Sequence, residues 1–172
     1  MKKQLRFSME EFSEKYDRYS PMLYRICILR LGNKQDAEDA LQNTFIKYCY
    51  KSPEFSDDAN EKAWLIRVAI NCCKDFQKSF WQKNTVGLEE AAEISTGVIE
   101  EAVRLIDLFE LSPKNRVVLE LFYYEGYSVS EISEILKISE GSVTSRLSRA
   151  RKKLKIEMEA NSDEKNGFVP EH

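Results

Sequence analysis

The chain has 172 residues and a formal net charge of -3, and 42% of its residues are hydrophobic while 32% are charged. Such a composition suits one globular domain or two small ones, and the sequence has no apolar run long enough to cross a membrane. Because no long apolar segment follows the basic start of the chain, we expect a cytoplasmic protein without membrane insertion.

The cysteine and histidine content argues against metal and cofactor sites. Cys27, Cys49, Cys72 and Cys73 show no C-x-x-C spacing, and the single histidine is His172. We expect buried thiols in a reducing compartment, no metal, no cofactor and no catalytic residue. The sequence also contains no P-loop and no G-x-G-x-x-G motif, so an enzyme is the weakest function class.

The N-terminal part of the chain predicts two helices. Ser8 and Glu11 form a capping box, which predicts a helix that continues to about Tyr19. Pro21 is placed at the start of a second helix, because proline is favoured in a first turn, and Gly32 is expected to end it.

A third helix is predicted from about Lys34 to Lys51, a loop over 52–60, and a fourth helix from about Glu61 to Phe80. The apolar stripe of the fourth helix consists of Leu65, Ala69, Cys72 and Phe76. The opposite stripe is mostly cationic and consists of Arg67, Asn71, Lys74 and Lys78, with Trp64 at its edge. Cations can follow phosphates, an aromatic ring can stack on a base and an amide can bind a base edge, which suits melted DNA. Packing of Trp64 on the preceding helix, with solvated lysines, fits the pattern equally well.

Residues 82–97 are acidic and have no clear helical period, so they predict a linker between two helical units. We therefore expect an all-α fold of two small helical domains, 1–81 and 98–157, joined by this acidic linker and followed by a polar tail over 158–172. Ser112 followed by Pro113 predicts the start of a helix in the second domain.

The C-terminal domain has the pattern of a helix-turn-helix that binds duplex DNA. A capping box of Ser128 and Glu131 starts one short helix, and Ser139 caps the next. The second helix places Val143, Leu147, Ala150 and Leu154 on one apolar stripe. Opposite lie Ser145, Ser148, Arg149 and Lys152, flanked by Thr144 and Arg151 on one side and by Ser142 and Arg146 on the other. Small hydroxyls allow close approach to base edges and cations suit phosphates, although a solvated basic face would show the same pattern.

Three segments resemble signatures of bacterial sigma factors. Residues 36–45, DAEDALQNTF, resemble DAEDLVQETF; residues 63–71, AWLIRVAIN, resemble AWLYRIARN; and residues 141–151, GSVTSRLSRAR, resemble GTVKSRLSRAR. Their order and spacing resemble the extracytoplasmic-function (ECF) class over about residues 9–154. The resemblance implies an ECF-type sigma factor that binds core RNA polymerase, directs it to specific promoters and helps open the duplex.

The resemblance also implies partners and residue roles. The partners are core RNA polymerase, with its flap and the clamp helices of its largest subunit, promoter DNA, and an anti-sigma factor. Docking on the clamp helices is assigned to Asp36, Glu38, Asp39, Gln42 and Phe45, with Phe45 or Ile46 adding an apolar contact. Recognition and melting of the minus-ten element are assigned to Phe55, Trp64, Arg67, Asn71, Lys74 and Lys78. Recognition of the minus-thirty-five element is assigned to Ser142, Thr144, Ser145, Arg146, Ser148, Arg149 and Lys152.

The chain departs from the family pattern at several positions. Cys49 stands where tryptophan is usual and Asn43 where glutamate is usual. Ile70 stands where a basic residue is common, and Ser79 where arginine is common. The missing positive charges predict weaker phosphate binding beside the minus-ten element.

Two other protein classes remain open. A helix-turn-helix transcription regulator with an N-terminal helical sensory or dimerisation domain accounts for 128–154, but not for 36–45 and 63–71. A protein-interaction module that binds polymerase without binding DNA is distinguished by charge reversal at Arg149 and Lys152, which would leave its activity intact.

Overall fold

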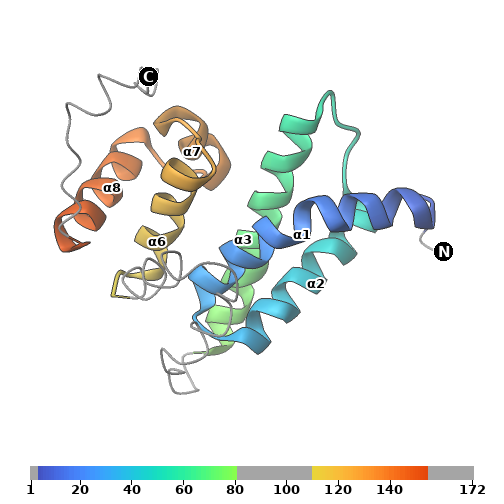
Figure 1. The fold of residues 1–172 in the computed structure, drawn as a ribbon, viewed down its shortest axis with the longest axis horizontal. Helices are drawn as coiled ribbons and strands as arrows, with labels where there is room; N and C mark the ends of the chain where they lie inside the picture. The colour runs from blue at the N-terminus through green and yellow to red at the C-terminus, as the bar shows by residue number, and fades with distance from the viewer. Residues whose placement is uncertain (1–3, 81–109, 155–172) are drawn as a thin grey trace. The chain divides into compact units, whose positions relative to one another are not determined.

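The computed structural model describes residues 4–80 and 110–154. The chain divides into two compact units, Met1–Ile94 and Ser95–His172. Every regular element within the described residues is helical, which confirms the expected all-α class (Figure 1). Most of the expected linker over 82–97 and the tail over 158–172 lie outside the described residues. None of the helices in the described ranges combines the length and apolarity that a membrane span requires.

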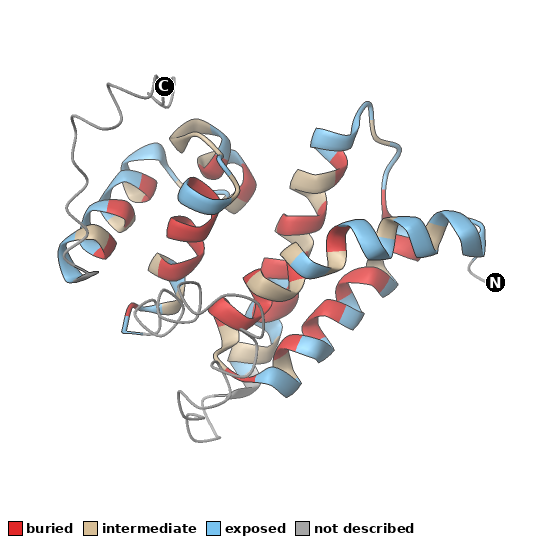
Figure 2. Cartoon of the chain, viewed as in Figure 1, coloured by how far each residue is buried: buried red, intermediate tan, exposed pale blue. Residues whose placement is uncertain are grey.

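Unit 1 is a bundle of three helices that pack against one another pairwise. They are α1 (Met9–Leu31), α2 (Lys34–Lys51) and α3 (Asp58–Phe80). The buried residues lie on the sides of these helices that face one another (Figure 2). Side chains that are fully buried there include Leu23, Ile26, Tyr48, Leu65 and Ile66. All four cysteines of the chain are also buried, as expected from the sequence.

One continuous helix, α1, replaces the two helices predicted before Gly32. The capping box of Ser8 and Glu11 is present and starts it. Pro21 lies inside the helix instead of starting a new one, so that prediction was wrong. Pro21 is exposed. The hydrogen bond that its missing N–H removes is therefore lost on the solvent side, where water can satisfy the carbonyl.

The loop between α2 and α3 is shorter than predicted, because α3 begins at Asp58 and not near Glu61. The side chain of Asp57 explains this difference. Its Oδ1 accepts a hydrogen bond from the backbone N–H of Asn60 at 2.7 Å, which is the contact of a helix cap.

Unit 2 contains α6 (Pro113–Leu119), a π-helical turn η1 (Glu120–Tyr124), α7 (Val129–Leu136) and α8 (Glu140–Leu154). Both α6 and α7 pack against α8. The predicted start at Ser112 and Pro113 and the predicted capping box of Ser128 and Glu131 are both present. The turn between α7 and α8 is made by Lys137, whose φ of 55° is the only positive value among the non-glycine residues described.

Candidate nucleic-acid and protein interfaces

A buried carboxylate joins the three helices of unit 1 at the start of α3. Glu61 is 5% exposed. Its Oε2 accepts hydrogen bonds from Lys15 Nζ at 2.7 Å and from the Tyr19 hydroxyl at 2.9 Å. The Tyr48 hydroxyl of α2 donates to its Oε1. We call Glu61 and these three donors the Glu61 cluster; because it anchors the first turn of α3, it also fixes the end of the preceding loop.

Protonation in the Glu61 cluster is set by burial and hydrogen bonding together. Burial alone would raise the pKa of Glu61, but the hydrogen bonds from Lys15, Tyr48 and Tyr19 outweigh it and lower this pKa below its ordinary value. Burial, followed by the hydrogen bond to Glu61, raises the pKa of both tyrosines. Glu61 is therefore ionised and the tyrosines are neutral near neutral pH. The cluster was not predicted from the sequence, although Glu61 precedes Leu65 by one helical turn and so lies on the apolar stripe of α3.

Two residues assigned to the minus-ten element are in contact at the start of α3. The rings of Phe55, in the loop, and Trp64 meet edge to face with centroids 5.7 Å apart. Trp64 also lies 6.3 Å from the ring of Tyr48, on the preceding helix. Trp64 is half-buried. It therefore packs on α2, as the alternative interpretation expected, and Phe55 covers another of its edges.

The loop itself is ordered by short polar contacts. Asn60 Nδ2 donates to Ser56 Oγ at 2.6 Å and to Asp57 Oδ2 at 3.1 Å. Arg18 on α1 forms an ion pair with Asp58 at 2.9 Å. The first two contacts join the end of the loop to the first turn of α3, and the ion pair joins that turn to α1. The end of the loop therefore has a defined position.

The polar face of α3 carries the remaining residues assigned to the minus-ten element. Asn71, Lys74 and Lys78 are exposed, and Arg67 is half-buried. Ile70, which stands where the family commonly has a basic residue, is 4% exposed. Ile70 therefore packs into the core of unit 1. The basic residue that the family commonly has here is replaced by a core side chain, and not by a neutral residue on the polar face of α3. The side chain of Ser79 lies outside the described residues.

The first turns of α2 present acidic and amide groups. Glu38, Asp39 and Gln42 are exposed, whereas Asp36 is half-buried. Asn33 caps this end of the helix, because its Oδ1 accepts from the Asp36 N–H at 2.8 Å while its Nδ2 donates to Asp36 Oδ2 at 2.8 Å. Asp36 thus belongs to the helix cap, and the other three residues face outward.

Of the two residues expected to add an apolar contact on this face, Phe45 is buried and Ile46 is exposed. Phe45 is 3% exposed and packs between the rings of Phe12, Tyr16 and Tyr48. Its neighbour Ile46 is 51% exposed and is the residue that can offer an apolar side chain to a partner. Helical periodicity alone did not distinguish which of these adjacent positions faces the core.

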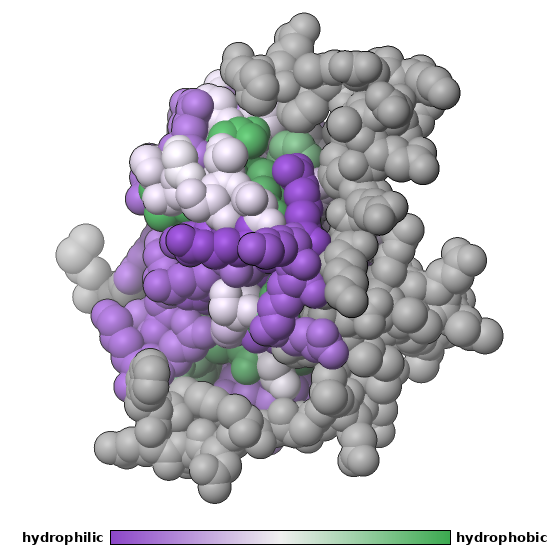
Figure 3. Space-filling view, turned by 90° about the vertical axis from the view of Figure 1, so that its left-hand side faces the viewer, coloured by the Kyte–Doolittle hydropathy of each residue, from purple (hydrophilic) through white to green (hydrophobic). Residues whose placement is uncertain are grey.

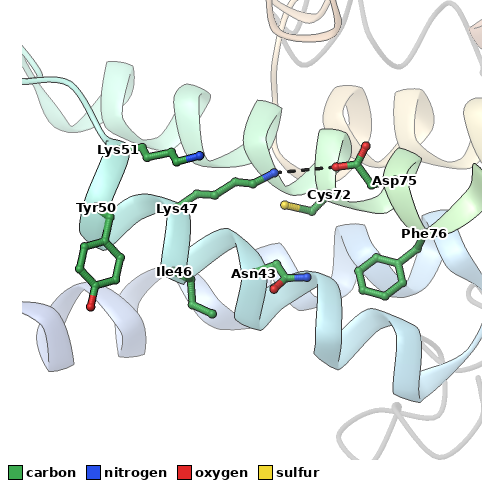
Figure 4. Close-up of a pocket in the computed structure, with 8 residues that line it drawn as sticks. All are labelled: Asn43, Ile46, Lys47, Tyr50, Lys51, Cys72, Asp75 and Phe76. Atoms are coloured by element: carbon green, nitrogen blue, oxygen red, sulfur yellow. Dashed lines mark ion pairs between the residues drawn. The ribbon is translucent and has the colours of Figure 1, made fainter. Parts of the chain in front are cut away.

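Ile46 and Tyr50 form an apolar ridge along α2 between two hollows. One hollow, of about 680 Å³, lies toward α1 and has Glu38 and Asp39 among its lining residues. The other, of about 400 Å³, lies toward α3, and Cys72 and Phe76 line it together with Lys47, Lys51, Asn43 and Asp75 (Figure 4). Lys47 is 3.9 Å from the carboxylate of Asp75 across this second hollow. The ridge is therefore acidic on one side and more basic on the other, which suits a protein partner with apolar and charged side chains.

The predicted apolar stripe of α8 is confirmed by the burial of Val143, Leu147 and Ala150; the Leu154 side chain lies outside the described residues. The exposed residues of its opposite face are Thr144, Ser145, Ser148, Arg149 and Lys152. Figure 3, which views the side on which α8 lies in Figure 1, shows a band of hydrophilic side chains there. This face joins hydroxyl groups and exposed cations over a packed helix, the combination that suits a DNA groove and its phosphates.

Two further predicted residues lie at the edges of this face. Ser142 is half-buried at the first turn, where its N–H donates to Ser139 Oγ at 3.1 Å. Arg146 is also half-buried. Burial, with a smaller contribution from the neighbouring charge of Arg149, lowers the pKa of Arg146. Arg146 remains charged because arginine does not lose its proton in proteins.

Comparisons with known proteins agree with both units. The family model of Sigma-70 region 2 matches residues 16–82, and that of Sigma-70 region 4 matches residues 108–154. The chain is 30% identical to the ECF RNA polymerase sigma factor SigL of Mycobacterium tuberculosis, over 84% of this chain and 86% of that protein. It is 30% identical to the ECF RNA polymerase sigma factor SigW of Bacillus subtilis, over 87% and 89% of the two chains.

Two solved structures are similar in fold. The sigma factor RpoE of Bartonella quintana, in complex with the anti-sigma factor NepR, has a TM-score of 0.68 at 22% identity and covers 87% of this chain and 99% of its own. CnrH, in complex with the cytosolic domain of CnrY, has a TM-score of 0.62 at 25% identity and covers 86% and 87%.

Proposed function

The chain belongs to the ECF class of RNA polymerase sigma factors, and from this premise we propose how its two units divide the work at a promoter. As a sigma factor it directs RNA polymerase to promoters. A regulator with a separate sensory domain is not favoured, because the match to Sigma-70 region 2 covers most of unit 1. We propose residues 1–81 as the domain for polymerase and the minus-ten element, and 98–157 as the domain for the minus-thirty-five element.

Unit 2 binds the minus-thirty-five element through α8. The observation that carries this proposal is the exposed face of hydroxyls and cations opposite a buried apolar stripe, on the second helix of a helix-turn-helix. In such motifs this helix enters the major groove. Arg149 can pair with guanine or a phosphate, Ser145 and Ser148 allow close approach to base edges, and Lys152 neutralises a phosphate. Ser142, Thr144 and Arg146 contact the DNA backbone at the edges.

Unit 1 binds the minus-ten element and helps to open it. The loop before α3 and the polar face of α3 form one surface, in which Phe55 and Trp64 touch and Asn71, Lys74 and Lys78 are exposed. A base that leaves the stack loses a few kcal/mol of stacking and pairing, so the protein must offer a replacement contact. Asn71 can supply hydrogen bonds to a base edge, while Arg67, Lys74 and Lys78 hold the strand.

Core polymerase docks on the outer face of α2. Glu38, Asp39 and Gln42 provide acidic and amide groups, and Ile46 takes the apolar role first assigned to Phe45. Basic and apolar side chains of the clamp helices would complement this surface. An anti-sigma factor is a second proposed partner, since one protein of similar fold is found in complex with the anti-sigma factor NepR and another with the cytosolic domain of CnrY. We place the protein in the cytoplasm, with no catalytic role of its own.

Run-off transcription with purified core polymerase tests this function. The protein should produce promoter-specific transcripts from a library of genomic promoters that core polymerase alone does not produce. Arg149→Glu with Lys152→Glu should abolish them, because both changes place acids against phosphates. Lys114→Glu, a single charge reversal of the same kind on the exposed part of α6, should leave them largely intact. Transcripts that survive the double reversal would refute the role of α8, and the absence of any specific transcript would refute the sigma function.

A further inference from the structure

One arginine beside the proposed DNA-binding face is held in place by an element outside the helix-turn-helix. Arg151 of α8 donates from its Nε to the hydroxyl of Tyr123 in η1, at 2.6 Å. Its guanidinium carbon lies 5.5 Å from the centroid of the Tyr123 ring and 5.6 Å from that of Phe122. These two rings meet nearly at right angles, with centroids 4.9 Å apart. Phe122 and Tyr123 thus form a corner against which the guanidinium rests.

The Tyr123 contact leaves the charge of Arg151 available. Its hydrogen-bond partner is a neutral hydroxyl, and no carboxylate within residues 4–80 and 110–154 forms an ion pair with it. An arginine carries five N–H donors in a rigid fork, and only the Nε donor is used by Tyr123. The two terminal amino groups therefore remain as a charged pair of donors, in the geometry that matches two oxygens of a phosphate.

The position of Arg151 on α8 directs this fork toward the edge of a bound duplex. At about 100° per residue, Arg151 falls on the same side of the helix as Thr144 and Ser148, next to the face that includes Arg149 and Lys152. When a helix lies in a major groove, the residues at the flanks of its central face approach the phosphates of the groove walls. The pairing with η1 keeps a long side chain from sampling other rotamers, which lowers the entropy lost on binding.

We propose that Tyr123 and Arg151 form a binding site for a backbone phosphate of the promoter duplex. Arg151 supplies the charge and the donors, and Tyr123 is a positioning residue that acts through Arg151. The site rests on the proposed function, because it requires the duplex to lie against α8. It adds a contact from η1, an element that the assigned minus-thirty-five residues do not include, and it contributes affinity and register but no base preference.

Closed-complex binding by the full-chain holoenzyme tests the site. Affinity is measured across a series of salt concentrations, on a promoter fragment and on the same fragment with its minus-thirty-five sequence replaced. We expect Arg151→Gln to lower the dependence of log affinity on log salt by about 0.9, the value for one phosphate contact. We expect Tyr123→Phe to weaken binding by about three- to tenfold on both fragments. Tyr124→Phe, which removes the hydroxyl of the next residue, is the matched control and should behave as wild type.

Several outcomes would overturn the site. An unchanged salt dependence for Arg151→Gln refutes the phosphate contact, and a loss confined to the native minus-thirty-five sequence shows base recognition in its place. A wild-type affinity for Tyr123→Phe refutes the positioning role. Arg151→Lys keeps the charge without the fork, so its salt dependence should match wild type while its affinity falls; thermal unfolding of each variant separates this from misfolding. A wild-type holoenzyme without promoter preference would refute the proposed function itself, and the site with it.

Discussion

The Tyr48 hydroxyl on α2 donates a hydrogen bond to the carboxylate of Glu61 at the start of α3. This contact ties a core residue of α2 to the first turn of α3, directly after the loop proposed to bind the minus-ten element. Lys15 and Tyr19 complete the same cluster from α1. The stability of unit 1 and the geometry of its proposed DNA-binding loop therefore depend on one carboxylate.

Glu61→Gln should lower the free energy of unfolding of unit 1 by about 2 to 4 kcal/mol, because an amide nitrogen then faces buried donors. Urea unfolding followed by circular dichroism measures the change. Glu54→Gln, the same substitution at an exposed loop position, should leave stability unchanged. Equal stability of the Glu61 variant and wild type would show that the cluster contributes little.

The cluster also predicts a pH window. The folded-state pKa of Glu61 is lowered, so its stabilising contribution is present above the ordinary value of 4.5 and is lost as the pH falls through the folded-state value. The pKa values of Tyr19 and Tyr48 are raised, so their contribution is present below 10.0 and is lost as the pH rises beyond it. Urea midpoints across this range should fall at both ends. In Glu61→Gln the acid-side loss should shrink, and an unaltered acid limb would contradict this assignment.

Phe45→Ala and Ile46→Ala should affect different properties although the residues are adjacent. Phe45 is 3% exposed, so its truncation should cost about 3 kcal/mol or more of stability. Ile46 is 51% exposed, so its truncation should cost less than about 1 kcal/mol but weaken binding to core polymerase. Thermal unfolding and a polymerase binding titration separate the two effects. Full polymerase affinity in Ile46→Ala would remove the ridge from the proposed interface.

Asn71→Ala should impair promoter melting without destabilising the fold, because Asn71 is exposed. Permanganate reactivity of unpaired thymines measures the opening, and electrophoretic mobility measures closed-complex binding. The defect should disappear on a template whose minus-ten region is already unpaired. A defect of equal size on that template would show that Asn71 does not act in the strand-opening step.

Lys137→Gly should stabilise unit 2 by roughly 0.5 to 1 kcal/mol, because glycine adopts the left-handed backbone of this turn without the strain of a Cβ. Thermal unfolding of the full chain measures the gain. Lys137→Ala retains the Cβ and should give no increase. A gain of equal size in both variants would mean that removal of the lysine charge, and not backbone strain, is responsible.

Local patterns in the sequence predicted the fold well where both partners of a contact are close in the chain. The capping boxes at Ser8 and Ser128 join residues three positions apart and are both present. The burial of Val143 and Leu147 followed from helical spacing in the same way. The capping contacts form within one turn of helix, and the buried stripe needs only the helical period, so neither depends on which distant residue is the partner.

Predictions failed where tertiary contacts decide the outcome. Glu61 obtains Tyr19 and Lys15 from 42 and 46 residues away, which no local pattern specifies. Phe45 turns inward because aromatic rings of α1 pack against it, and the sequence around Phe45 does not reveal these distant contacts. Pro21 stays within α1 because packing of the helix outweighs one lost hydrogen bond on the solvent side.

Under the proposed minus-ten role of this loop, the cap at the start of α3 limits how the protein can acquire a new set of target genes. Asp57 and Asn60 start the helix, and Glu61 ties it to the core, so mutations there would alter promoter preference only at the expense of folding. Pro53 and Glu54 are exposed and precede the cap. Evolutionary change in minus-ten preference is therefore expected to accumulate in the first half of the loop, while the second half is held by selection on stability.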